Sequence, residues 1–168
     1  AHRARVLDAV AGGVEAGAKF VVDGRAFQHN SHPNGCFVGP SLFDHVTESM
    51  EIYKREIFGP VLVVLRVEDF GAAVALVNRN PYGNGTAIFT GSGYHARAYS
   101  RQVQVGMVGV NIPIPAPIAT HPFGGWKHSV FGDTAMHGAE STHFYTRAKT
   151  VTARWPEVGE AEAGMFSM

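Results

Sequence analysis

The sequence has little cysteine, no net charge and no long apolar run. Cys36 is its one cysteine, so an intramolecular disulfide is impossible and a reducing compartment is favoured. Fourteen basic residues balance fourteen acidic ones, which gives no reason to expect nucleic acid or an acidic membrane surface as partner. No run approaches the ~20 apolar residues of a membrane span. We expect a soluble globular protein of the cytoplasm, or of the mitochondrial matrix if it is eukaryotic.

Several common site patterns are also missing. No Gly-x-Gly-x-x-Gly follows a predicted strand, so the sequence does not contain the usual dinucleotide-binding turn. Gly124-Gly125 lacks the Lys-Ser/Thr of a phosphate-binding loop and is interpreted as a tight turn. His29 and His32 lie three apart without a third ligand nearby, so no metal site is predicted. Cys36 is assigned a packing role and not that of a nucleophile.

What is present is an alternation of helical and extended patterns. Helices are predicted at 3–16, 68–78 and 93–103, and strands at 19–22, 37–43, 50–53, 61–65, 86–90 and 107–111. The continuous apolar run at 61–65 suits a strand buried on both faces of a parallel sheet. This order of elements predicts an α/β fold with a largely parallel sheet.

The regular pattern ends after Asn111. Residues 112–137 contain Pro113, Pro115, Pro117 and Pro122, and a loop of this length is usually functional or packed against another element. Residues 145–155 then alternate β-branched and basic side chains, which predicts an exposed strand that needs an edge to pair with. Residues 157–168 are acidic and rich in small side chains, which is typical of a loose tail.

Two segments are most informative when they are taken together, Arg55-Glu56-Ile57-Phe58-Gly59-Pro60-Val61 and Pro122-Phe123-Gly124-Gly125-Trp126-Lys127. This pair resembles two signature segments of the aldehyde dehydrogenase superfamily, in the same order. The segments 106–115, 131–133 and 144–155 are similar to the CoA-acylating methylmalonate-semialdehyde dehydrogenase branch. The resemblance runs from about Val6 to Pro156 and implies the C-terminal part of the α/β catalytic domain. We therefore expect a piece of a longer protein.

The resemblance implies roles for individual residues. Glu56 matches the glutamate that hydrogen-bonds the nicotinamide ribose of NAD, and Phe58 matches the aromatic near the nicotinamide. Arg55 departs from the family, whose members often have a second acid there. The positions implied to line the substrate tunnel are Asn111, Ile114, Pro115 and Ile118. The family's catalytic cysteine has no match in this sequence.

The resemblance also implies an organisation and an assembly. Residues 1–143 would form part of the catalytic domain, residues 144–156 an oligomerisation strand, and residues 157–168 a C-terminal tail. The expected assembly is a homo-oligomer, a dimer or a tetramer, held through 144–155.

Two hypotheses for function remain open at the level of sequence. In the first, the chain is part of an NAD-dependent dehydrogenase of valine catabolism that oxidises an aldehyde through a cysteine thioester resolved by CoA or water. The chain alone would then be inactive. In the second, it is a truncated or split-protein module that folds and associates without turnover. The reading frame upstream of Ala1 would distinguish them, because only the first requires a cofactor domain and a nucleophile there.

Overall fold

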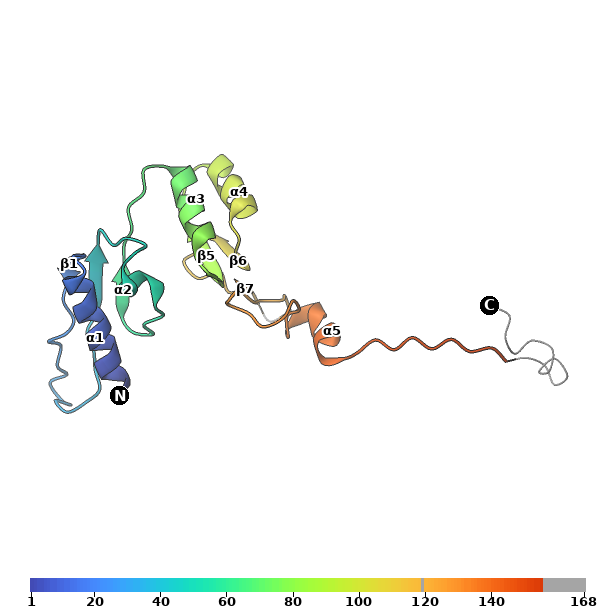
Figure 1. Ribbon diagram of the computed structural model, residues 1–168, viewed down its shortest axis with the longest axis horizontal. Coiled ribbons are helices and arrows are strands. Elements are labelled where there is room, and N and C mark those ends of the chain that lie inside the picture. The colour runs from blue at the N-terminus through green and yellow to red at the C-terminus, as the bar shows by residue number, and fades with distance from the viewer. Residues whose placement is uncertain (119, 156–168) are drawn as a thin grey trace. The chain divides into compact units, whose positions relative to one another are not determined.

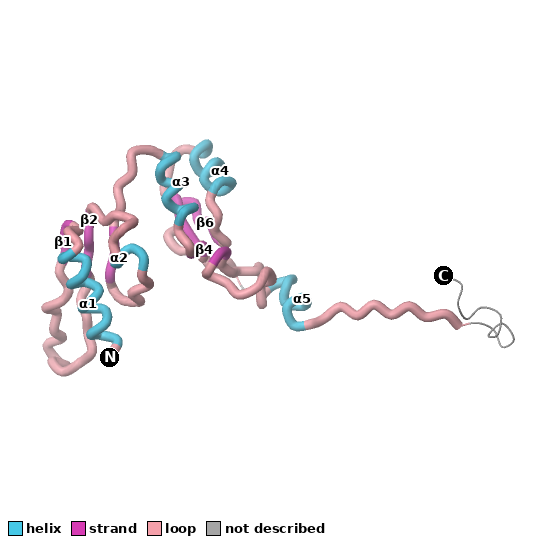
Figure 2. Tube along the Cα trace, viewed as in Figure 1, coloured by secondary structure: helices cyan, strands magenta, loops and turns pink. Residues whose placement is uncertain are grey.

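The computed structural model describes residues 1–118 and 120–155 of the chain (Figures 1 and 2). The chain divides within α3 into two compact units, Ala1–Ala73 and Val74–Met168. The first unit contains α1 (His2–Glu15), β1 (Lys19–Val22), β2 (Ser41–Asp44), α2 (Glu51–Lys54), β3 (Val61–Val63) and the start of α3 (Phe70–Arg79). Within the described residues, no helix has the length and apolar character that crossing a membrane would require.

The sheet of the first unit has the order β1-β2-β3. Strand β1 pairs antiparallel with β2, with Lys19 opposite Asp44. Strand β2 pairs parallel with β3, with Ser41 opposite Val61. The predicted strand at 19–22 is confirmed and the predicted strand at 37–43 is shorter, since β2 begins at Ser41. The α/β class is confirmed, but this sheet is mixed and not largely parallel.

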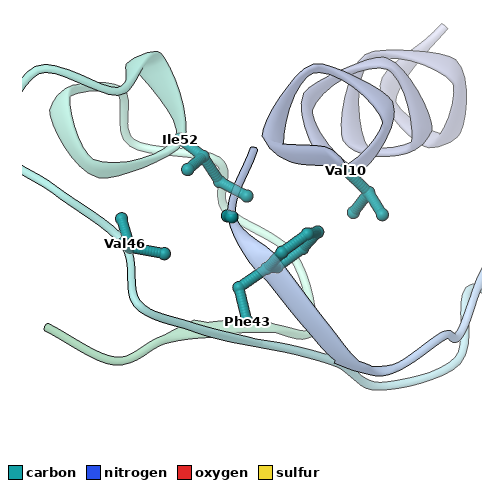
Figure 3. Packing of buried hydrophobic residues seen from close by; sticks show 5 residues of the cluster. Val10, Phe43, Val46 and Ile52 are labelled. Atoms are coloured by element: carbon teal, nitrogen blue, oxygen red, sulfur yellow. The ribbon is translucent and has the colours of Figure 1, made fainter. Parts of the chain in front are cut away.

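Phe43 is the centre of the core of the first unit (Figure 3). Its side chain is fully buried, and its ring stacks on that of Phe20 with centroids 4.4 Å apart. Val10 of α1 and Ile52 of α2 pack against it. Gly13 of α1 faces the same cluster, where a Cβ would come within 3.2 Å of the Phe43 ring. Burying one such side chain contributes roughly 1.5–3 kcal/mol, so this cluster holds helix α1 on the sheet.

Two predictions for the first unit are wrong. Residues 50–53 are not extended, because α2 forms a single helical turn that buries Ile52 and leaves Glu51 and Lys54 paired outside at 3.2 Å. Strand β3 is not buried on both faces, since Leu62 is 63% exposed. The reason is its place in the sheet: among the described residues β3 has only β2 as a neighbouring strand.

The second unit is built on one parallel strand pair. Its elements after α3 are β4 (Tyr82–Gly83), β5 (Gly85–Ile88), α4 (Gly93–Gln102), β6 (Met107–Val110), β7 (Trp126–Lys127), the 3₁₀ turn η1 (Gly138–Glu140) and α5 (Ser141–Tyr145). Strands β5 and β6 are parallel, with Gly85 opposite Met107, and α4 connects them. The buried Tyr99 of α4 hydrogen-bonds Thr86 of β5 through their hydroxyls, 2.6 Å apart. The predicted helices at 68–78 and 93–103 and the predicted strands at 86–90 and 107–111 are confirmed, with shifted ends.

The region after β6 is mostly irregular, as predicted. Its two-residue strand β7 pairs antiparallel with β4. Tyr145 is the last residue of α5, so the prediction that it begins a strand is wrong. Residues 147–155 form neither helix nor strand within the described part of the chain. The predicted tail at 157–168 lies outside the described residues.

Candidate functional site

The loop at 55–60, which joins α2 to β3, is anchored close to its C-terminal end. The Ser41 amide donates to the Pro60 carbonyl over 2.9 Å, and the Val61 amide donates to the Gly59 carbonyl over 2.7 Å. Gly59 lies directly on the buried Val6 of α1, where an added Cβ would come within 2.9 Å of both Val6 methyl groups. Glycine is therefore needed at this position because the backbone touches the helix.

Phe58 stands out on this loop in two ways. Its φ is 57°, in the left-handed region, which costs a non-glycine residue roughly 1–2 kcal/mol. Its side chain is 78% exposed, so packing within the unit does not account for an aromatic residue there. A strained backbone that presents an apolar ring to solvent is typical of a site that contacts a ligand or a partner.

Glu56 is exposed on the same loop. Within residues 1–118 and 120–155, no ion pair or side-chain hydrogen bond engages its carboxylate. Two free acceptor oxygens suit the adjacent hydroxyls of a ribose, and the nearby Phe58 ring offers a flat apolar contact. These two residues therefore fit the role that the sequence predicts for them toward NAD, which stays a prediction.

Asn111, which the sequence predicts to line the substrate tunnel, makes hydrogen bonds to Thr90 and Ile88. Its Oδ1 accepts from the Thr90 amide over 2.9 Å, and its Nδ2 donates to the Thr90 carbonyl over 3.1 Å. Its own amide donates to the Ile88 carbonyl over 2.8 Å. The residue adopts φ 57°, which asparagine tolerates better than most residues. Asn111 thus ties the end of β6 to the chain that follows β5.

The other three predicted tunnel residues divide into two kinds. Pro115 is half-buried and folds over the strand pair, since a Cβ on Gly85 would come within 3.2 Å of its ring. Ile114 and Ile118 are 74% and 71% exposed. Pro115 therefore fixes the loop on β5, while the two isoleucines present apolar side chains to solvent. Glu56 and Phe58 belong to the first unit, and these loop residues belong to the second.

The Pro122–Lys127 segment is held by the end of α3. The Lys127 ammonium donates to the carbonyls of Asn78 and Asn80, each over 2.9 Å. Cations are favoured at a helix C-terminus because its last carbonyls lack intrahelical partners. The Asn78 side chain in turn donates to the Gln102 carbonyl at the end of α4 over 2.9 Å. Lys127 thus connects the segment to the end of α3, a role that its sequence context did not indicate.

The backbone at Gly124 and Gly125 lies close to other segments of the chain. The Gly124 carbonyl lies where a Cβ on Gly106 would have to be, and a Cβ on Gly125 would meet Ser129. The turn predicted here therefore brings three segments of backbone together. Beside it an open cavity of about 1070 Å³ is lined mainly by residues 122–137. Phe123 lines this cavity and stacks on His137 with centroids 4.4 Å apart.

The loop that contains Cys36 is packed by aromatic and histidine rings. Cys36 is exposed, so the prediction that it has a packing role is wrong. Phe37 packs instead, and its ring stacks on His29 with centroids 5.0 Å apart. His32 lies close to His29, with ring centroids 5.2 Å apart. In the described part of the chain, no group of three or more His, Cys, Asp or Glu side chains could hold a metal ion.

Comparison with known proteins places these segments in context. Residues 1–151 match the profile described as the aldehyde dehydrogenase family. The malonate-semialdehyde dehydrogenase of Pseudomonas aeruginosa is 52% identical over 167 residues, which cover 99% of this chain and 34% of that protein. The mitochondrial acylating methylmalonate-semialdehyde/malonate-semialdehyde dehydrogenase of Bos taurus is 47% identical, over 91% of this chain and 28% of that protein.

Solved structures give the same result. A crystal structure of a protein from Sinorhizobium meliloti that is assigned as a methylmalonate-semialdehyde dehydrogenase, complexed with NAD, matches with a TM-score of 0.88 and 50% identity over 95% of this chain and 32% of that one. The enzyme of the same name from Oceanimonas doudoroffii matches with a TM-score of 0.87 and 51% identity over 94% and 32% of the two chains. The chain spans about a third of the length of the curated relatives it matches. The resemblance that the sequence predicted is confirmed, and the chain belongs to the aldehyde dehydrogenase family.

Proposed function

We propose that this chain is the C-terminal third of an NAD-dependent methylmalonate- or malonate-semialdehyde dehydrogenase. In the complete enzyme a cysteine thiolate outside this chain would attack the aldehyde to give a thiohemiacetal. Loss of a hydride from that adduct would leave a thioester, which CoA would resolve. NAD, when bound, accepts the hydride. The names of the relatives from Pseudomonas aeruginosa and Bos taurus support the substrate, and the word acylating in the bovine name supports CoA over water.

One observation carries the proposal. The loop at 55–60 is fixed at Gly59 and Pro60, yet it presents the free Glu56 carboxylate and the exposed Phe58 ring to solvent. Glu56 would accept hydrogen bonds from the nicotinamide ribose, and Phe58 would pack beside the nicotinamide. The NAD complex of the Sinorhizobium meliloti relative supports the choice of cofactor.

The second unit would contribute to the substrate side. Ile114 and Ile118 present apolar side chains that suit the walls of a tunnel for a small aldehyde. Pro115 and Asn111 would hold that wall on the strand pair through the contacts described above. We further propose that residues 146–155 pair with another subunit to form a homo-oligomer, a dimer or a tetramer, and that the enzyme acts in the cytoplasm or the mitochondrial matrix.

The test is Glu56→Gln in the complete enzyme. Hydrogen bonds to charged groups contribute about 1.5–3 kcal/mol, so NAD affinity or the hydride-transfer rate should fall roughly tenfold or more. Glu51→Gln is the matched control, because Glu51 is a neighbouring exposed glutamate whose partner is Lys54. Binding is measured by quenching of protein fluorescence and hydride transfer by single-turnover absorbance. Identical NAD kinetics in Glu56→Gln and Glu51→Gln would refute the ribose assignment.

A further inference from the structure

His2, on the first turn of α1, contacts the loop of Glu56 and Phe58 from outside it. Its Nε2 lies 2.8 Å from the Phe58 carbonyl oxygen, across 56 positions of sequence. A carbonyl oxygen can only accept, so Nε2 must carry the proton and donate. The contact is made to the backbone of Phe58, the residue whose φ of 57° is costly to maintain.

Arg5 fixes the state of the same imidazole from its other side. The Arg5 guanidinium lies 2.9 Å from Nδ1 of His2. Guanidinium groups only donate, so Nδ1 must be the unprotonated acceptor. The two contacts together fit the tautomer with its proton on Nε2, aimed at the Phe58 carbonyl.

The underside of the loop rests on the same helix turn. Gly59 lies on Val6, one helical turn after His2. Helix α1 therefore contacts two consecutive residues of the loop, Phe58 through His2 and Gly59 through Val6. The Val6 contact constrains only where the backbone lies. The His2 contact constrains the direction of the Phe58 carbonyl, and therefore the left-handed turn that exposes the ring and places Glu56 two residues earlier.

We infer that His2 is a positioning residue for the cofactor loop. Its Nε2 proton binds the Phe58 carbonyl and so fixes the direction of that carbonyl. The fixed carbonyl in turn keeps the Glu56 and Phe58 side chains exposed to a ligand, and Arg5 selects the tautomer. The inference rests on the proposed function in so far as the loop binds NAD. The loop geometry itself can be tested without any cofactor.

The first test uses residues 1–168 without cofactor. It compares two substitutions of His2 that place a hydrogen-bond donor at different distances from the Phe58 carbonyl. His2→Gln puts an amide nitrogen near the position of Nε2, whereas His2→Asn puts it near Nδ1, too short to reach Phe58. Loss of an ordinary hydrogen bond should raise the rate of tryptic cleavage after Arg55 about threefold to tenfold in His2→Asn. His2→Gln should cleave at the parent rate. Cleavage after Arg147, in the other unit, is the internal reference, and fragments are counted by mass spectrometry.

A second measurement reads the tautomer directly. The ¹⁵N spectrum of the parent imidazole should show the proton on Nε2, and Arg5→Gln should lower that preference. A proton on Nδ1 in the parent chain, or equal cleavage after Arg55 in His2→Asn and His2→Gln, overturns the inference.

The consequence for NAD is tested in the complete enzyme. His2→Asn should raise the NAD dissociation constant about threefold to tenfold, since one positioning contact is lost, and His2→Gln should restore it. The rate at saturating NAD should change less than the affinity. If Glu56→Gln leaves NAD binding unchanged, the proposed function fails while the cleavage result stands. If Glu56→Gln weakens binding but His2→Asn does not, the positioning role of His2 is refuted alone.

Discussion

At the scale of single residues, we expect Phe58 to lower the stability of the fold while it favours the binding of NAD. Its φ of 57° is unfavourable for any residue with a side chain, and its ring is 78% exposed. Phe58→Gly removes the backbone cost of roughly 1–2 kcal/mol and loses little burial, although glycine has more entropy in the unfolded chain. We expect the free energy of unfolding in urea to stay equal or rise by about 1 kcal/mol, while the complete enzyme binds NAD more weakly. A clear loss of stability would show that the ring packs within the unit.

Asp44, at the end of β2, has a strongly lowered pKa. The Arg66 guanidinium binds both carboxylate oxygens, at 3.0 and 2.7 Å, and the His45 amide donates to Oδ1 over 2.8 Å. The Arg66 hydrogen bonds first, and the His45 amide second, lower the pKa of Asp44 from 3.8 to about 2. Both contacts favour the ionised form.

The sign of the pH dependence follows from this depression. A folded-state pKa below the unfolded value stabilises the fold at pH values above 3.8, and that contribution is lost as the pH falls through about 2. Arg66→Gln should raise the pKa of Asp44 toward 3.8 and shift the loss to higher pH. A ¹³C carboxyl titration of the two proteins measures both values, with Arg25→Gln as a control because Arg25 pairs with Asp23 instead. An Asp44 pKa that is the same with and without Arg66 would contradict the assignment.

Sequence patterns identified some of these residues and could not identify others. Glu56 and Phe58 stand in a contiguous motif, so their types and spacing could be recognised directly. His2 and Lys127 act on carbonyls 56 and 49 positions away, and no local pattern encodes such a pairing. Asn111 was predicted at the correct strand end, but its amide partners at Thr90 depend on the register of β5 and β6.

At the scale of elements, Lys127 links β7 to the C-terminus of α3 through two hydrogen bonds. Lys127→Met keeps the length of the side chain and removes its donors from the carbonyls of Asn78 and Asn80. Since these are partly buried hydrogen bonds of a charged group, we expect the second unit to lose about 1–3 kcal/mol. Lys54→Met is the matched control, because its pair with Glu51 is exposed and should contribute no more than about 0.5 kcal/mol. Amide exchange of α3 and β4 measures the effect. Equal protection in both variants would show that the Lys127 hydrogen bonds do not stabilise the second unit.

Helices were predicted correctly where the helical spacing of apolar residues repeats over several turns, and were missed where the helix is too short for that spacing to repeat. The long α1 and the ten-residue α3 and α4 show helical spacing over several turns. Helix α2 is a single turn, so its four residues cannot be distinguished from a strand by period. The apolar run at 61–65 correctly indicated a strand, but composition does not say how many neighbours a strand has, and Leu62 is exposed.

At the scale of the whole molecule, the exposed apolar side chains agree with a chain that is a third of its relatives in length. Phe131 is 99% exposed, and Ile114 and Ile118 are more than two-thirds exposed. Side chains of this kind in such number are typical of surfaces that another domain or subunit covers. Their types could be listed from the sequence, but their exposure could not, because it depends on which segments of the folded chain pack over them.

The stretch from Thr146 to Trp155 has the exposure expected of a strand that pairs with another chain. Its side chains are exposed, with Val151 and Trp155 at 75% and 91%, and within the described residues no strand ladder includes 147–155. Backbone groups without partners and β-branched side chains favour pairing with an edge strand of a second subunit. We therefore expect residues 1–168 to sediment as a dimer or larger species.

Two truncations separate this stretch from its neighbours. A chain that ends at Tyr145 keeps α5 and should sediment as a monomer or precipitate, because the pairing strand is missing while its apolar surfaces remain. A chain that ends at Pro156 keeps the stretch and should retain the assembly of the parent. The fluorescence of Trp155 supplies a second readout, since burial at an interface should shift its emission to shorter wavelength as concentration rises. A parent chain that stays monomeric at high concentration, with Trp155 emission unchanged, would rule out assembly through this stretch.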